Sequence, residues 1–310
     1  MAVHRPSGCC GREKRGDHDR EARGSSQRRC GARDLVRRRL EGVLHEVRRS
    51  AATRPRRELL RLDGLTKRYG GKVALDGLDL SVHAGEVDGL LGPNGSGKST
   101  ALHLLTGIIA PTAGYVTVAG VPIGDKRSRR HLGFAPDDLP LPYALTGQEY
   151  LAFHASVHGC HDRPLVQRLT EAFGLGEALE IPLRAYSHGM KRKIQVVAAV
   201  AHLPEVLVLD EPFRGLDPGA AILLRILVSS YARSGRGVVI ATHDLVRAER
   251  DCDLVNIVFE GRSVAAGSPW ALVSAVPGDT LEDVFLAVTG EGPDVRSFST
   301  QMTEVFDGDG

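Results

Sequence analysis

The chain has 310 residues, 42% of them apolar, which is enough for a large domain with a substantial core. It holds no uninterrupted apolar run of about 18 residues and no apolar stretch behind its N-terminal arginines, so we expect neither a membrane span nor a secretory signal. Five cysteines without a paired spacing argue against a disulfide framework and favour a reducing compartment, so we expect the protein in the cytoplasm.

The net charge of +2 is unevenly distributed. Residues 1–57 hold 17 Lys and Arg against 7 Asp and Glu, whereas the other 253 residues hold 23 against 31. We predict that residues 1–57 are a basic, largely disordered tail. Within it, residues 34–49 place four apolar side chains on one helical face: Val36, Leu40, Val43 and Val47. This helix could lie on an anionic membrane surface; the alternatives are a solvated extension without a fixed role, or an upstream start codon.

Ordered structure is predicted from Glu58 onward. Residues 59–63 alternate like a strand, residues 65–71 are polar and Gly-rich and predict a turn, and residues 78–82 predict a second strand.

The segment Gly92–Thr100 (GPNGSGKST) fits the phosphate-binding pattern G-x-x-x-x-G-K-[ST] at every position. A mostly apolar strand (86–91) precedes it and a helix follows it as far as Gly107. In this context backbone N–H groups face inward around an anion, next to a helix N-terminus with a partial positive charge. Lys98 would reach the β- and γ-phosphates, and the Ser99 hydroxyl would bind Mg²⁺. We predict that a nucleoside triphosphate binds Gly92, Asn94, Gly95, Ser96, Gly97, Lys98, Ser99 and Thr100.

The next segments predict a strand over 115–118, a basic polar segment over 126–131 and a further strand that reaches Asp137. Thr146 and Glu149 form the pattern of a capping box at the start of a helix, and a second helix is predicted over 164–173. Four neighbouring side chains match no zinc spacing, so we interpret them as surface residues: His154, His158, Cys160 and His161.

Two stretches further along carry chemistry. Ser187 and Gly189 lie in a turn ahead of a helix over 191–201, which makes a helix N-terminus suited to an anion. The apolar run 206–209 predicts a buried strand that ends in Asp210 and Glu211. Asp210 would hold Mg²⁺ through water, and Glu211 would deprotonate the attacking water as a general base.

The rest of the chain predicts a helix over 220–233, a strand over 237–241, strands over 254–259 and 263–264, and a short helix over 281–288. Residues 291–310 are acidic and Gly-rich, so we predict a disordered acidic tail.

These motifs, in this order over residues 58–290, resemble the ATP-binding cassette of ABC transporters, in its exporter type. The resemblance implies an α/β fold: a P-loop NTPase core with a mostly parallel sheet, an N-terminal antiparallel β subdomain, and an inserted helical subdomain at about 139–186. It implies a nucleotide-binding domain over 58–290.

The resemblance also implies roles for single residues. An aromatic at the position of Tyr69 stacks on adenine in this family. Ser187 and Gly189 would reach the γ-phosphate of the nucleotide held by a second subunit, and Asp217 would lie in the loop that couples the two sites. His243 would contact the γ-phosphate. Asp137 stands where a glutamine is usual, and a carboxylate can also ligate Mg²⁺ through water.

The predicted catalytic residues are therefore Glu211, His243 and Lys98, and the predicted Mg²⁺ ligands are Ser99, Asp210 and Asp137. We expect ATP and Mg²⁺ as cofactors, separate transmembrane permease subunits as partners, a homodimer or a heterodimer with a second such subunit, and no nucleic acid. The expected location is the inner face of the cell membrane, peripherally, through the permease.

The alternative is a soluble cassette ATPase that acts on DNA or ribosomes. Such proteins carry a long coiled coil or zinc-binding insert between the two ATP motifs, or a second cassette, whereas Lys98 and Asp210 are separated here by 112 positions without such an insert. A regulatory ATP sensor without turnover is disfavoured because Glu211 is present.

Besides Asp137, four residues depart from the family pattern. Asp88 lies in the strand that leads to the phosphate loop, where a buried carboxylate would be costly. His188 stands where a glycine is more common, and Phe213 and Arg214 replace small or polar residues ahead of Asp217, which makes coupling between the two sites less certain.

Overall fold

The computed structural model describes residues 57–137, 141–159 and 162–290. The predicted tails, including the helix proposed for residues 34–49, lie outside the described residues, as do Cys160 and His161. The domain limits therefore remain predictions. None of the helices in the described part of the chain is both long and apolar enough to cross a membrane.

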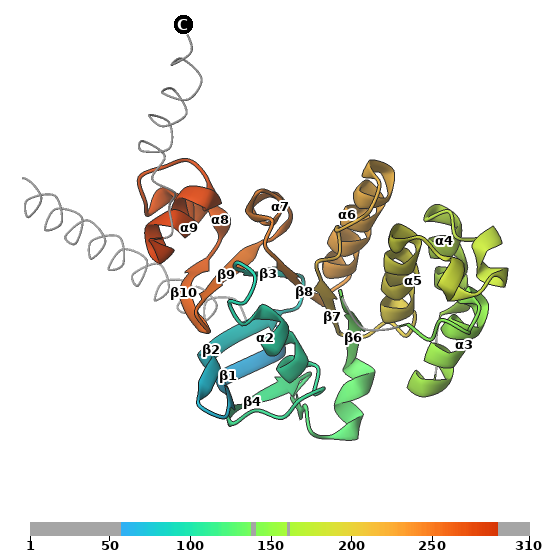
Figure 1. Ribbon diagram of the computed structural model, residues 1–310, viewed down its shortest axis with the longest axis horizontal. Coiled ribbons are helices and arrows are strands. Elements are labelled where there is room, and N and C mark those ends of the chain that lie inside the picture. The colour runs from blue at the N-terminus through green and yellow to red at the C-terminus, as the bar shows by residue number, and fades with distance from the viewer. Residues whose placement is uncertain (1–56, 138–140, 160–161, 291–310) are drawn as a thin grey trace, which may run out of the picture.

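A six-stranded sheet forms the centre of the molecule (Figure 1). All neighbouring strands run parallel except β10, which runs antiparallel to β9 at one edge of the sheet. The strand order is β10 (Arg262–Gly267), β9 (Leu254–Phe259), β3 (Val87–Leu91), β8 (Gly237–Thr242), β7 (Val206–Asp210) and β6 (Leu132–Ala135). All five residues of β7 are buried, as expected for a continuous apolar run that is covered on both faces.

A second, antiparallel sheet packs with helix α2 (Lys98–Leu105) against one face of the central sheet (Figure 1). Its order is β2 (Lys72–His83), β1 (Glu58–Tyr69), β4 (Ala113–Val118) and β5 (Val121–Pro122). The turn predicted over residues 65–71 is wrong, because β1 continues to Tyr69 and only Gly70 and Gly71 turn the chain. Leu65 is fully buried opposite Leu78, and register shifts around it let a partly polar segment stay paired.

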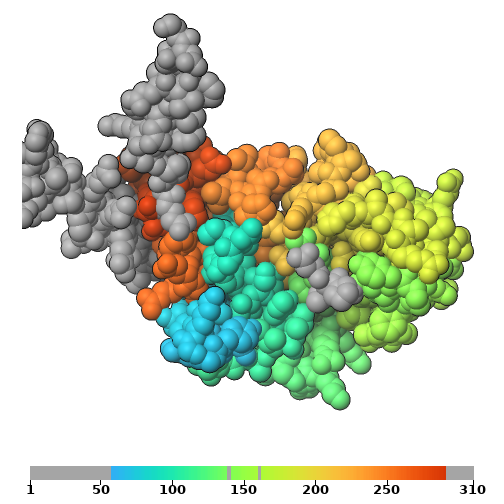
Figure 2. Space-filling view, in the orientation of Figure 1, coloured from blue at the N-terminus to red at the C-terminus, as the bar shows by residue number. Residues whose placement is uncertain are grey.

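The segment between β6 and β7 is mainly helical and occupies one end of the molecule (Figure 2). The capping box of Thr146 and Glu149 is present at the start of the first helix. Helix α5 begins at His188 instead of Lys191, because Ser187 caps it by accepting a hydrogen bond from the Met190 backbone. The elements of this segment are α3 (Gly147–His158), α4 (Arg163–Ala172), η2 (Glu177–Glu180), η3 (Leu183–Ala185) and α5 (His188–Val200). A further 3₁₀ helix, η1 (Lys126–His131), lies just before β6.

The remaining helices are α6 (Pro218–Arg233), α7 (Leu245–Asp251), α8 (Pro269–Ser274) and α9 (Leu281–Thr289). The sequence analysis missed α7 and α8, which are too short to show a helical period, although Asp244 and Ser268 cap them. Helix α9 is confirmed. The two sheets and the helical insert together confirm the predicted fold class.

Asp88 is a carboxylate buried near the start of β3. Its side chain is 3% exposed, and its Oδ2 atom has no hydrogen-bond partner among the described residues. Burial, with the nearby carboxylates of Glu86 and Asp253, raises the pKa of Asp88 well above its ordinary value. The folded protein therefore favours the protonated form of this side chain.

Asp88→Asn should make the protein more stable, and the gain should grow with pH. The native pKa lies above the unfolded value of about 3.9, so the parent loses stability as pH rises through this interval, by up to ~1.4 kcal/mol per pH unit. Urea unfolding of both proteins from pH 5 to 8 measures the difference. Asp279→Asn, at an exposed carboxylate, is the control. A gain that does not change with pH would contradict an ionisation penalty at Asp88.

Candidate nucleotide site

The phosphate loop between β3 and α2 is packed against the backbone of two other segments. Gly92 has φ 155° and Gly97 has φ 112°, both in the region that favours glycine. A Cβ atom on Gly92 would lie 2.2 Å from the Val258 carbonyl oxygen, and one on Gly97 would lie 2.8 Å from that of Ala74. Side chains at these two positions would therefore displace the loop.

Lys98 lies under the loop at the start of α2. Its side chain is buried, and Nζ donates to the Gly92 carbonyl oxygen (2.7 Å) and to that of Pro93 (3.1 Å). Burial lowers the pKa of Lys98, and the nearby Glu211 and Asp210 oppose this effect. The ammonium group is thus held where the loop would receive phosphates.

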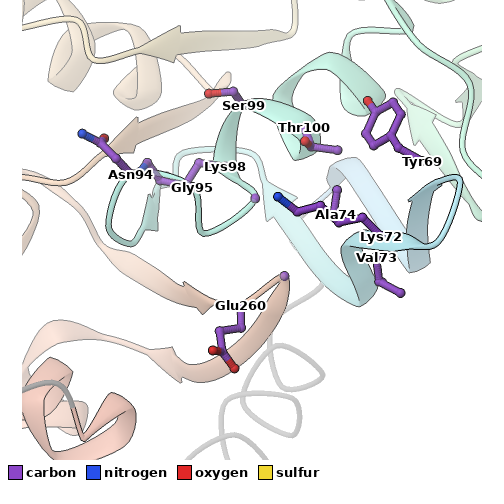
Figure 3. A pocket seen from close by; sticks show the side chains of 12 residues that line it. Tyr69, Lys72, Val73, Ala74, Asn94, Gly95, Lys98, Ser99, Thr100 and Glu260 are labelled. Atoms are coloured by element: carbon purple, nitrogen blue, oxygen red, sulfur yellow. The ribbon is translucent and has the colours of Figure 1, made fainter.

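A cavity of about 570 Å³ extends from the phosphate loop to Tyr69 (Figure 3). Tyr69 is half exposed, and the Lys67 ammonium lies 5.1 Å from the centroid of its ring. Of the predicted residues, the lining contains Tyr69, Asn94, Gly95, Gly97, Lys98, Ser99 and Thr100. The sequence analysis did not identify the other lining residues: Lys72, Val73, Ala74, Glu260 and Gly261.

Asp210 ends β7 and is 9% exposed. Burial, then the negative charges of Asp137 and Glu211, raises the pKa of Asp210 to about 6. Buried carboxylates crowded in this way are a suitable environment for a divalent cation, which would offset their repulsion. The Asp210 carboxylate therefore fits the chemistry of a Mg²⁺ ligand, and the Ser99 hydroxyl lines the nucleotide cavity.

Glu211 is held by donors at the end of β8. Its Oε2 accepts from the Thr242 hydroxyl (2.9 Å), and its Oε1 accepts from the His243 backbone N–H (3.0 Å). The Nδ1 atom of His243 lies 2.7 Å from the same Oε1. Glu211 also has φ 45°, unusual for a non-glycine residue, and its N–H donates to the Ala241 carbonyl. The orientation of the Glu211 carboxylate is thus fixed by hydrogen bonds from the side chains of Thr242 and His243 and from the backbone of His243.

Ser187, Gly189 and Asp217 are not part of this cavity's lining. Ser187 caps α5, and Asp217 caps α6 while accepting a hydrogen bond from Lys193 (3.1 Å). A Cβ on Gly189 would lie 2.9 Å from the Gly215 carbonyl oxygen, so the two turns pack together. Ser187 and Gly189 thus lie at a helix N-terminus that does not line the chain's own nucleotide cavity.

Asp137 lies close to Asp210, but its carboxylate is held by two arginines. Arg192 donates to Oδ1, and Arg214 donates to Oδ2 (2.8 Å). Both carboxylate oxygens of Asp137 are therefore already hydrogen-bonded to guanidinium groups.

The histidines of α3 pack against neighbouring rings. Within the described residues no group of three or more His, Cys, Asp and Glu side chains is arranged to hold a metal ion. His158 stacks on His202 with ring centroids 3.7 Å apart, and His154 packs edge-on against Tyr150. Both histidines of α3 are half-buried instead of fully exposed, because they pack on neighbouring rings.

A phosphate loop between a strand and a helix, with paired carboxylates at the end of a parallel strand of the same sheet, defines a P-loop nucleoside triphosphatase. Residues 75–214 match the family described as ABC transporter. The chain is 33% identical to the linearmycin resistance ATP-binding protein LnrL of Bacillus subtilis (strain 168), over 75% of this chain and 76% of that protein.

It is also 36% identical to the Nod factor export ATP-binding protein I of Ralstonia nicotianae, over 73% of this chain and 72% of that protein. A solved structure described as the ATP-binding subunit of an ABC transporter superposes with a TM-score of 0.70 at 30% identity, over 74% of this chain and 99% of that one. The chain belongs to the ATP-binding subunits of ABC transporters, and it is an ATPase.

Thr242 was missed by the sequence analysis and offers a test of how Glu211 is oriented. Its hydroxyl donates to Glu211 and accepts from the Asp244 N–H. Thr242→Val removes this bridge at nearly constant shape, which should cost about 1–2 kcal/mol, or roughly 5- to 30-fold in kcat. The KM for ATP should stay within a few-fold, because Thr242 is not part of the cavity lining. Thr242→Ser keeps the hydroxyl and should retain most activity; equal losses in both variants would exclude the hydrogen bond as the cause.

Proposed function

We propose that this chain is the ATP-hydrolysing subunit of an exporter and works with separate transmembrane permease subunits. The names of its relatives support export: one confers linearmycin resistance and others serve Nod factor export. The observation that best supports hydrolysis is the orientation of the Glu211 carboxylate, just after β7, by hydrogen bonds with Thr242 and His243. The relatives do not favour the alternative of a soluble cassette acting on DNA or ribosomes.

In this proposal the nucleotide lies in the cavity between Tyr69 and the phosphate loop. Tyr69 stacks on the adenine through the ring face that Lys67 leaves free. The loop amides of Gly95 and Gly97 and the ammonium of Lys98 bind the phosphates. Ser99 and Asp210 would hold Mg²⁺, and the bound ion would neutralise part of the phosphate charge.

Glu211 accepts the proton of the attacking water, because its carboxylate is already oriented by donors that do not belong to the substrate. His243, whose side chain is 56% exposed, would contact the γ-phosphate.

Two chains are needed to close each site. Ser187 and Gly189 of one chain reach the γ-phosphate bound by the other, and Asp217 belongs to the loop between the two sites. An anion-binding helix N-terminus that does not face the chain's own cavity supports this assignment. We therefore expect a homodimer or a heterodimer, held at the inner face of the membrane by the permease subunits.

Glu211→Gln tests both hydrolysis and pairing. The variant should lower turnover by roughly 10²- to 10⁴-fold, because it loses general-base assistance. ATP affinity should survive, since Lys98 and the loop are unchanged. Unhydrolysed ATP should then hold two chains together, so size-exclusion chromatography should give a dimer with Mg-ATP and a monomer with ADP.

Adding Ser187→Arg should abolish the dimer, because a bulky cation would fill the contact with the γ-phosphate. A Glu211→Gln protein that binds ATP yet stays monomeric would argue against the shared site. Wild-type turnover in this variant would remove Glu211 from catalysis.

A further inference from the structure

Arg192 is a buried guanidinium that the sequence analysis did not single out. It lies on α5, close behind the turn of Ser187 and Gly189, and its side chain is 2% exposed. Burying a guanidinium is costly unless its donors are paired, and breaking such a pair leaves the partner charge uncompensated. The partners of Arg192 therefore show what this position requires.

Its donors join three parts of the fold. Nη1 donates to the carbonyl oxygens of Pro136 (2.6 Å) and Asp210 (3.3 Å), just beyond β6 and at the end of β7. Nη2 donates to the carboxylate of Asp137. Helix α5 runs beside these strands (Figure 1), so one planar group sets the spacing between the helix and both strand ends.

Arg214 completes the arrangement from the opposite side. Its Nη1 donates to the second oxygen of Asp137 at 2.8 Å, and its backbone N–H donates to the carbonyl oxygen of Glu211 at 3.1 Å. Both carboxylate oxygens of Asp137 are therefore occupied by guanidinium groups. Arg214 is well exposed, whereas Asp137 is 11% exposed at its side chain. We call Arg192, Asp137 and Arg214 the arginine clamp.

We propose that Arg192 is a positioning residue for ATP hydrolysis and acts through the arginine clamp. This inference rests on the proposed function. The clamp fixes the peptide between Asp210 and Glu211 through the Asp210 carbonyl oxygen, and it joins this peptide to the helix that carries Ser187 and Gly189. Small displacements of a catalytic group from its productive geometry cost large factors in rate.

The clamp also controls the charge at the metal site. Asp137 and Glu211 each lie close enough to Asp210 for their charges to act on it. Neutralised by two arginines, Asp137 leaves Asp210 as the carboxylate offered to Mg²⁺. Without the arginines, a third free carboxylate would compete for the ion and repel the other two.

The test is a double-mutant cycle in the full-length chain, with kcat, KM for ATP and the Mg²⁺ concentration for half-maximal rate as readouts. Arg192→Gln should lower kcat by roughly 10- to 100-fold, with KM for ATP within about threefold, because Arg192 does not line the cavity. The Mg²⁺ concentration for half-maximal rate should differ from that of the parent. Asp137→Asn added to this variant should recover much of the loss, because it removes the carboxylate left unpaired.

Arg214→Ser gives a second arm that does not depend on a buried substitution. It should lower kcat less than Arg192→Gln does, and Asp137→Asn should relieve that loss too. Arg225→Gln is the matched control: Arg225 Nε lies 3.3 Å from a carboxylate oxygen of the buried Asp251, and neither residue lines the nucleotide cavity. This control should lose stability and keep its ATPase rate.

Parent rates and parent Mg²⁺ dependence in folded Arg192→Gln and Arg214→Ser would overturn the proposal. So would losses that multiply with Asp137→Asn instead of being relieved by it, because independent effects would show that the two arginines do not act through Asp137. If Arg192→Gln does not fold, Arg214→Ser alone decides. A parent chain without ATPase activity would instead refute the proposed function, so the two failures are distinguishable.

Discussion

The nucleotide cavity depends on close backbone contacts between the phosphate loop and two distant segments. The Gly261 N–H donates to the Ser96 carbonyl oxygen, and the Gly261 carbonyl oxygen accepts from the Asp76 N–H. Ala74 lies so close to Gly97 and Gly261 that a Cβ on either would meet its carbonyl oxygen within 3 Å. These contacts join the antiparallel sheet, which carries Tyr69, to the central sheet, which carries the phosphate loop. These contacts therefore set the distance between Tyr69 and the phosphate loop.

The same contacts explain how far the sequence could predict this site. The phosphate loop and the strand ending in Asp210 and Glu211 are continuous segments whose chemistry is local, so their patterns identify them. Glu260 and Gly261 lie in an ordinary turn between two strands, and no local pattern indicates that this turn meets Ser96. Thr242 and Arg192 were missed for the same reason. Their partners are 31 and 55 residues away, and only the parallel order of the strands brings them together.

Two departures from the family pattern acquire a common physical cause in the arginine clamp. Asp137 adds a negative charge where a glutamine is usual, and Arg214 adds a positive charge where a small or polar residue is usual. Each alone would disturb the charge around Asp210 and Glu211. Their hydrogen bond of 2.8 Å, together with Arg192, neutralises the added carboxylate. The sequence showed both residues but not their contact, so they could be interpreted only as separate anomalies.

Asp88 and Asp137 show how the place of an acidic residue in the fold decides which partners its carboxylate acquires. Asp137 lies beyond the carboxyl end of β6, where α5 and the turn after Glu211 converge and supply two guanidinium groups. Asp88 lies near the amino end of β3, and the charges that act on it come from other carboxylates. Asp137 is thus paired with two cationic side chains, whereas burial and the neighbouring carboxylates raise the pKa of Asp88. Helix N-termini and polar loops gather at the carboxyl edge of a parallel sheet, which is also where ligands bind in such folds. An acidic residue added at this edge can therefore acquire a partner and a role, whereas one added at the opposite edge mainly costs stability.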